Sequence, residues 1–245
     1  METARLADYA IWGVALLLYV YDAARLLGPH DMMLVEAGRT HLTAALADNP
    51  FGSRTRSVAF APLHLPHRGV FVATWGRLWS DDAALTRTLE SLARLRASLR
   101  PVRVLAAVAG VLLFIVGPVL TAALGPDAAV VGTAAALYPT AAAAVAVLWW
   151  WRRRLELTPG RAAVLSVEVL ICPAFLPNLV RKITAHRPLD TDGAQLLLAT
   201  VPDALRGEFL ARLARRTEAL LEEDTTDVAE HARLRAYLAT LEDER

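Results

Sequence analysis

The sequence predicts a mainly α-helical membrane protein with about four hydrophobic helices. An apolar run covers 102–124 and, after the short connection Gly125-Pro126-Asp127, a second covers 128–151. Each is longer than the roughly 20 apolar residues that cross a bilayer as a helix. The 245 residues are 55% hydrophobic, with a mean hydropathy of +0.36. A third, less regular run at 162–180 completes a predicted membrane domain over 101–182, in which the first two runs form a helical hairpin.

The first hydrophobic segment is expected within 1–28. Residues 9–27 are apolar enough to span, and aromatic side chains such as Trp12 and Tyr21 can anchor the ends at the interface. A cleaved signal peptide is the alternative, but the segment has no basic start and carries Asp22 and Arg25 near its end. We therefore predict an uncleaved transmembrane helix.

A small antiparallel β module is expected over 29–80. The short runs 32–37 and 41–46 flank Gly38-Arg39-Thr40 and predict a hairpin. Residues 48–52 have the composition of a turn, and two further β-type runs follow at 58–65 and 70–75. Some fifty residues make a thin core, so the module is expected to lean on the membrane or on a partner.

An amphipathic helix is predicted over 81–100. Acidic residues at its start suit the helix dipole, and leucines recur at helical spacing from Leu85 to Leu99. The arginines on its other side are consistent with a solvated face packed against the sheet, or with a basic helix lying on anionic lipid. Both interpretations stay open.

The tail, 183–245, is predicted to be soluble and helical. Pro202-Asp203 opens one helix to about Glu223, and Asp227 caps a second that runs to about Leu241. Together they predict a helical hairpin. Its acidic surface is typical of a solvated face, and a partner-docking surface is the alternative.

Arginines near the ends of the apolar runs set the expected orientation. Arg152, Arg153 and Arg154 stop the second long run directly after three tryptophans. With the arginines of 94–103 they fall on one side of the membrane, which makes the loop 28–101 cytoplasmic. Segment 162–180 complicates this, because a full crossing would place Arg181 and Lys182 outside. It either crosses irregularly or re-enters and returns.

A bacterial cytoplasmic (inner) membrane is the expected location. Lys182 is the only lysine, so 25 of the 26 basic residues are arginine, which together with the abundant alanine is typical of GC-rich bacterial genomes.

Two acids and one arginine form the candidate intramembrane polar cluster: Asp22, Arg25 and Glu168. Asp22 lies roughly 7 Å from the end of its run and Glu168 roughly 10 Å into the last, both measured from the same side. Charged groups at such depths usually face protein or water. The favoured interpretation is an interhelical clamp in which Arg25 pairs with either acid, and the alternative is a proton or ion relay.

The last run contains a proline-broken motif made of Cys172, Pro173, Pro177, Asn178 and Arg181. Two prolines four apart leave carbonyls unpaired, and the side chains of Asn178 and Arg181 carry donors that could fill them. With Asp22 and Glu168, this pattern resembles a family of bacterial inner-membrane proteins of unknown function. In that family an Asp-bearing first helix precedes a small β module, and a late helix carries Glu, Cys-Pro, Asn and Arg. Ala174 departs from the family's paired proline. The resemblance implies an architecture and no activity.

Other chemistry finds little support. His64 and His67 are weak metal candidates, because the intervening Pro66 prevents helical spacing and no carboxylate or cysteine lies nearby. No phosphate-binding loop or hydrolase motif is present, so no cofactor and no enzyme activity are predicted. A formal net charge of +1 gives no pull toward nucleic acid. A membrane enzyme would have Cys172 as its only candidate nucleophile, and we expect that thiol to be buried and inert.

These observations predict a scaffold, accessory or assembly subunit of a membrane complex. Its expected contacts are membrane lipid and a protein partner or further copies of itself. The alternative is a small homo-oligomeric transporter or channel component that uses Asp22 and Glu168.

Overall fold

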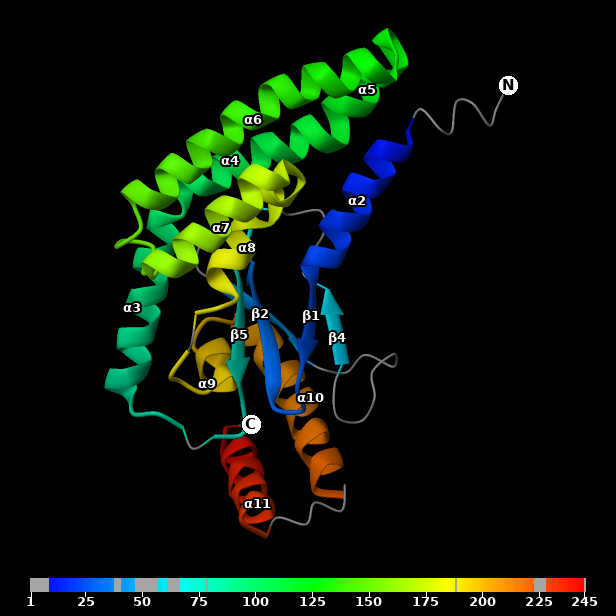
Figure 1. Ribbon diagram of the computed structural model, residues 1–245. Coiled ribbons are helices and arrows are strands. Elements are labelled where there is room, and N and C mark those ends of the chain that lie inside the picture. Colours follow the sequence, from blue (N-terminus) through cyan, green and yellow to red (C-terminus); the bar gives the residue numbers. More distant parts are fainter. Residues whose placement is uncertain are drawn as a thin grey trace. The chain divides into compact units, whose positions relative to one another are not determined.

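The computed structural model describes residues 9–37, 41–46, 57–60, 67–77, 79–187, 189–222 and 228–244. The chain divides into two compact units. The helical unit comprises 1–25, 60–70 and 92–187, and the mixed unit comprises 26–59, 71–91 and 188–245. The chain is mostly helical, with a small antiparallel sheet after the first helix, as predicted (Figure 1).

Two long helices dominate the helical unit. The first consists of three consecutive segments, α4 (Arg100–Val111), the π-helical η1 (Leu112–Val116) and α5 (Gly117–Leu124). The second is α6 (Pro126–Trp150), which packs back along α4 and α5 (Figure 1). The predicted three-residue connection is tighter in the structure, because Gly125 alone separates the helices at a φ of 89°. A side chain would be strained there, so glycine sets this turn.

The π-helical segment has a local cause in the sequence. Pro118 lacks an N–H and its ring crowds the carbonyl of residue 114, one turn before it. The backbone widens over Leu112–Val116, and the N–H of Gly117 bonds the carbonyl of Leu112. Among the described residues, two helices are long and apolar enough to cross a membrane, Arg100–Leu124 and Pro126–Trp150.

The first helix, α2, is shorter than predicted. It spans Ala10–Ala23, and the chain then continues as strand β1 (Ala24–Leu27). Fourteen residues rise about 21 Å, compared with the ~30 Å hydrocarbon core. Apolar content alone does not distinguish a helix from a strand here. β1 pairs with β4 (Ser57–Phe60) in a two-stranded sheet.

The third hydrophobic run is broken, as its prolines predict. Helix α7 (Pro159–Ile171) ends before Cys172, and the 3-10 helix η2 (Pro173–Asn178) and helix α8 (Leu179–Thr184) follow. η2 packs against α2, α4, α6 and α7. The break therefore places a short helix where four others meet.

A close contact joins α2 to α5. Trp12 Nε1 donates to Thr121 Oγ1 at 2.8 Å, and a Cβ added to Gly117 would overlap the Trp12 ring. Gly117 is thus the position at which the indole can approach the helix backbone.

Gly117→Ala is expected to destabilise the helical unit by about 1–3 kcal/mol, because the added methyl must displace Trp12. Thermal unfolding of the detergent-solubilised full chain measures this. The control is Gly132→Ala, where a Cβ would meet only Leu120 Cδ1 at 3.7 Å and the helix should become slightly more stable. Equal behaviour of the two variants would contradict the close contact.

The mixed unit contains a three-stranded sheet in the order β3-β2-β5. Its strands are β2 (Asp31–Ala37), β3 (His41–Leu46) and β5 (Val70–Thr74). β2 and β3 are antiparallel with Met32 opposite Leu46 and Ala37 opposite His41, the predicted hairpin. The predicted turns at 38–40 and 48–52 lie outside the described residues.

Four of the described helices, α3, α9, α10 and α11, are formed by the segments 82–98 and 193–243. α3 (Asp82–Ser98) matches the predicted amphipathic helix, and α10 (Asp203–Glu222) packs against α11 (Val228–Asp243) as the predicted hairpin. The short α9 (Gly193–Leu198) was not predicted and packs against β2 and β3. The tail from residue 188 onward therefore shares one compact unit with the β module. The predicted cap Asp227 lies outside the described part of the chain.

Candidate functional site

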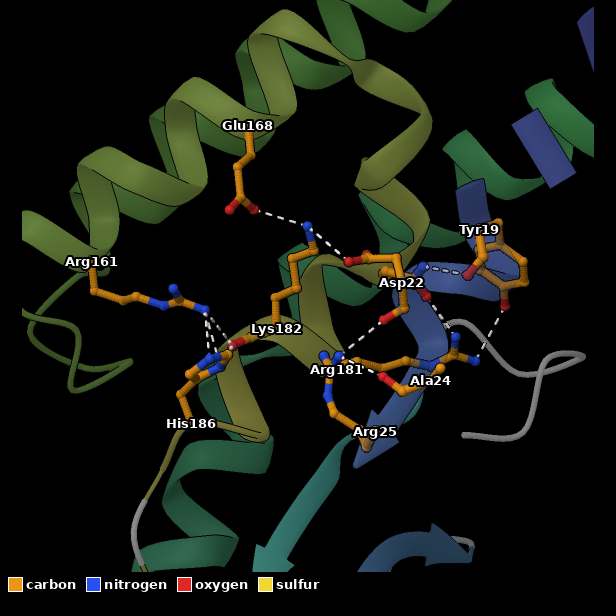
Figure 2. A network of polar contacts seen from close by, with 10 residues as sticks. Tyr19, Asp22, Ala24, Arg25, Arg161, Glu168, Arg181, Lys182 and His186 are labelled. Carbon is orange, nitrogen blue, oxygen red and sulfur yellow. Dashed lines mark hydrogen bonds and ion pairs between the residues drawn. The ribbon is translucent and has the colours of Figure 1, made fainter. Parts of the chain in front are cut away.

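The ammonium group of Lys182 lies between two carboxylates in the helical unit. Lys182 Nζ is 2.8 Å from Glu168 Oε2 and 3.1 Å from Asp22 Oδ1 (Figure 2). Lys182 is on α8, Glu168 on α7 and Asp22 in the last turn of α2. The sole lysine of the sequence therefore ties three helices together.

The cluster is largely withdrawn from solvent. The side chains of Lys182, Asp22 and Glu168 are 9%, 16% and 35% exposed. Water screens such ion pairs less than surface pairs, and an unpaired charge at this site would be costly. The ring of Phe175 adds a cation–π contact, with Nζ 4.3 Å from its centroid. The cluster is thus suited to fixing α2 against α7 and α8.

Arg25 makes a different contact from the predicted ion pair with Asp22 or Glu168. Arg25 Nη1 donates to the backbone carbonyls of Asp22 at 3.2 Å and of Ala24 at 3.0 Å. Arg25 makes this contact because α2 ends at Ala23, so Arg25 lies just beyond the helix. The backbone is extended from Ala24, and the carbonyls of the last turn have no further helical N–H partners. Arg25 therefore binds these carbonyls. The cation that pairs with Asp22 and Glu168 is Lys182 and not Arg25.

A second set of polar contacts joins the broken segment to α2. Arg181 is 1% exposed, donates through Nη1 to Asn178 Oδ1 and through Nη2 to the Tyr19 hydroxyl at 3.2 Å. Its guanidinium carbon lies 5.3 Å from the Tyr19 ring centroid. Asn178 Nδ2 donates to the Tyr19 carbonyl at 3.0 Å. Asn178 and Arg181, which we predicted to fill carbonyls freed by the prolines, both bind the first helix.

The two prolines position these donors. Pro173 begins η2 and Pro177 lies inside it, so the chain turns after Cys172 and brings Asn178 and Arg181 toward α2. Cys172 is a free thiol of intermediate exposure, whereas the sequence predicted a buried one.

A contact between Arg161 and His186 lies beside the ion cluster. Arg161 Nη2 is 3.0 Å from His186 Nδ1, and the Lys182 carbonyl lies 3.1 Å from the same nitrogen (Figure 2). Burial first, and then the charge of Arg161, lowers the pKa of His186. The imidazole is therefore neutral at neutral pH and adds no charge beside Lys182.

The remaining predicted site residues lie elsewhere. Arg154 stacks over Trp151 with 5.4 Å from guanidinium carbon to ring centroid, which matches an aromatic and charged end to α6. Of the weak metal candidates, His64 lies outside the described residues and His67 is inside them. The described ranges contain no cluster of three or more His, Cys, Asp or Glu side chains suited to a metal.

A polar network in the mixed unit was not predicted. Asp192 is 1% exposed and caps α9: its Oδ1 accepts from the N–H groups of Ala194 and Gln195 and from the Tyr237 hydroxyl at 3.0 Å. Its Oδ2 accepts from the Arg77 N–H at 3.0 Å. The Asp-Gly sequence before an apolar run was the local signal for this cap.

Comparisons of the sequence with protein-family models and curated proteins, and of the fold with solved structures, find no match.

Proposed function

We propose that the chain is a multi-pass protein of a bacterial inner membrane that acts as a scaffold or accessory subunit of a membrane complex. The membrane assignment is supported by the exposure of the two long apolar helices. Only 33% of the most apolar window of Arg100–Leu124 and 22% of that of Pro126–Trp150 are buried. A core helix of a soluble domain buries most of its apolar side chains, and these two do not.

The other apolar segments share this property. Large hydrophobic side chains are exposed on α2 and α7, including Leu17 at 69% and Ile171 at 77%. In this proposal α4–α5 and α6 cross the bilayer, while α2 and the broken α7–η2 segment pack beside them within it. The arginine-rich ends keep residues 28–101 on the cytoplasmic side.

One observation supports the scaffold role: buried charged side chains of the helical unit bind other helices of the same unit. Lys182 binds both Asp22 and Glu168, and Arg181 binds Asn178 and Tyr19. These side chains join helices to one another, which is what a structural clamp requires. The second compact unit, which has its own sheet and helical hairpin, then suits attachment of a protein partner.

The first expected result is that the chain stays in the membrane pellet after alkaline carbonate extraction and, purified in mild detergent, carries a protein partner in fixed ratio. Mass spectrometry of crosslinked complexes measures the ratio and maps the contacts, which should lie in the mixed unit. Release by carbonate would contradict the membrane assignment. A pure homo-oligomer would contradict the accessory role.

One observation favours the transporter alternative. Asp22 Oδ2 is buried and has no hydrogen-bond partner among the described residues, so the contact with Lys182 leaves one carboxylate oxygen available to a relay. In that case Asp22→Asn and Glu168→Gln would assemble normally but abolish ion flux in proteoliposomes. The clamp instead predicts that these variants lose stability.

A further inference from the structure

Positive charge is concentrated in the helical unit. Its three segments, 1–25, 60–70 and 92–187, contain 14 Arg or Lys residues and 6 Asp or Glu residues, whereas the mixed unit contains 12 and 19. The unit that carries the long apolar helices is therefore the basic part of the chain. An anionic ligand is expected on this unit and not on the acidic mixed unit.

Four arginines of the helical unit gather around the connection between α6 and α7. Arg152, Arg153 and Arg154 follow α6 directly, and Arg161 lies in the first turn of α7. The two helices pack against each other, so these residues lie at one end of the helical unit (Figure 1). Arg153 and Arg154 are exposed, and the other two are partly exposed. We call these four residues the arginine patch.

The arginine patch lacks an acidic partner among the described residues. From 128 to 187 the sequence contains two acids, Glu156 and Glu168. Glu156 Oε2 pairs with Arg187 Nη2 at 2.6 Å, and Glu168 Oε2 pairs with Lys182 Nζ at 2.8 Å. No ion pair joins an arginine of the patch to an Asp or Glu within the described ranges. The charge of the patch is therefore available to an external anion.

The contact of Arg161 shows where such an anion would add a counter-charge. Arg161 Nη2 lies 3.0 Å from His186 Nδ1, and no described carboxylate bonds either side chain. His186 precedes Arg187, which pairs with Glu156 in the connection after α6. Arg161 and this connection therefore meet at the end of α8. A phosphate there would accept charge-assisted hydrogen bonds from guanidinium groups that now have no acid to bind.

The side chains beside the patch indicate that the phosphate belongs to a lipid. Trp149 and Trp150, the last two residues of α6, are 47% and 87% exposed. Exposed indoles directly before a run of arginines are typical of the headgroup level of a bilayer, where the ring meets hydrocarbon and the charge meets phosphate. A soluble anion would leave both indoles in water. This step rests on the proposed membrane location of α6.

We propose that the arginine patch binds the phosphate of an anionic phospholipid. The guanidinium groups donate hydrogen bonds to the phosphate oxygens, and the exposed indoles contact the upper part of the acyl chains. A headgroup with a net negative charge is preferred over a zwitterionic one, because the patch would repel the cation that a zwitterionic headgroup carries.

Lipid binding to the full chain in detergent micelles measures this preference. The delipidated protein is titrated with dioleoylphosphatidylglycerol or dioleoylphosphatidylcholine, which share their acyl chains and phosphodiester, and bound lipid is counted by native mass spectrometry. The wild-type chain should bind phosphatidylglycerol at least roughly tenfold more tightly. The preference should decrease as the salt concentration rises. Inorganic phosphate at the same concentration should not displace the lipid, because it has no acyl chains to contact the indoles.

The triple variant Arg152→Gln, Arg153→Gln, Arg154→Gln tests the patch, and its preference should fall to about twofold or less. Lysine at the same three positions keeps the charge and should keep most of the preference. If the triple glutamine variant does not fold, Arg153→Gln alone decides the question. The Arg153 side chain is exposed and bonds no described residue, so this change should only reduce the preference, by roughly half.

A control variant removes the same number of charges from exposed positions of the mixed unit: Arg212→Gln, Arg215→Gln and Arg235→Gln. Its net charge equals that of the triple patch variant, but the arginine patch is intact. It should therefore prefer phosphatidylglycerol as strongly as the wild-type chain does.

Four results would overturn the inference: equal affinity of the wild-type chain for the two lipids, a wild-type preference in the triple glutamine variant, an equal loss in the control variant, or displacement of the lipid by inorganic phosphate. Binding of a hexaglutamate peptide without binding of phosphatidylglycerol would assign the patch to an acidic protein and overturn it as well. The assay reports neither membrane retention nor partner capture, so failure of this inference is distinguishable from failure of the proposed function.

Discussion

Lys182→Met is expected to lower the free energy of unfolding of the helical unit by about 3 kcal/mol, as for other partly buried ion pairs broken on one side. Methionine has a similar length but no charge, so the carboxylates of Asp22 and Glu168 lose their shared partner. Most of the cost comes from Asp22, because Glu168 remains one-third exposed and can be solvated. Thermal unfolding in mild detergent measures the loss.

Removal of the stranded charges tests whether the loss is electrostatic. The triple variant Lys182→Met, Asp22→Asn, Glu168→Gln should recover part of the stability, since it leaves no unpaired carboxylate. Arg25→Met should cost less than Lys182→Met, because the hydrogen bonds of Arg25 go to the backbone carbonyls of Asp22 and Ala24 and not to a charged group. The exposed pair Arg212–Glu208 gives a surface reference, and Arg212→Met should change stability by about 0.5 kcal/mol or less. If Lys182→Met unfolded at the same temperature as the wild-type chain, the clamp would be contradicted.

The position of this clamp illustrates which parts of the site are accessible from sequence. Two acids at similar depth in the first and last apolar runs predicted that Asp22 and Glu168 would meet, and the structure places both at one ammonium group. The identity of the cation depends on where α2 ends. Because β1 begins at Ala24, Arg25 leaves the helix, and a chain rich in apolar residues gives no local sign of that change.

The same distinction holds for the fold. The long hairpin, the β2–β3 pair and the α10–α11 pair follow from local apolar patterns and turn residues. The union of the tail with the β module depends on contacts between distant residues. Arg77 and Ser80, for example, meet Asp192 and Gln195, 115 positions away in each case. Periodicity within a window carries no information about such pairs.

Asp192→Ala is expected to destabilise the mixed unit by about 3 kcal/mol. The variant removes the cap of α9 and leaves the buried hydroxyl of Tyr237 and the N–H of Arg77 without their acceptor. Hydrogen–deuterium exchange of the full chain should show faster exchange in peptides from 71–77 and 189–200, with 126–150 of the helical unit as the internal reference. Unchanged exchange in the first two regions would contradict the role of Asp192.

The pH dependence separates the charge of Asp192 from its hydrogen bonds. Burial raises the pKa of Asp192, and the hydrogen bonds from Arg77, Gln195, Tyr237 and Ala194 oppose that shift without cancelling it. A carboxyl whose folded pKa lies above the unfolded value makes folding less favourable at high pH, where the buried group is charged. As the pH falls through the raised pKa toward the ordinary value of 3.8, that cost disappears. The wild-type chain should therefore gain stability relative to Asp192→Asn on acidification, because asparagine does not titrate. A constant or decreasing difference between the two would mean that the hydrogen bonds outweigh burial and hold the carboxylate charged.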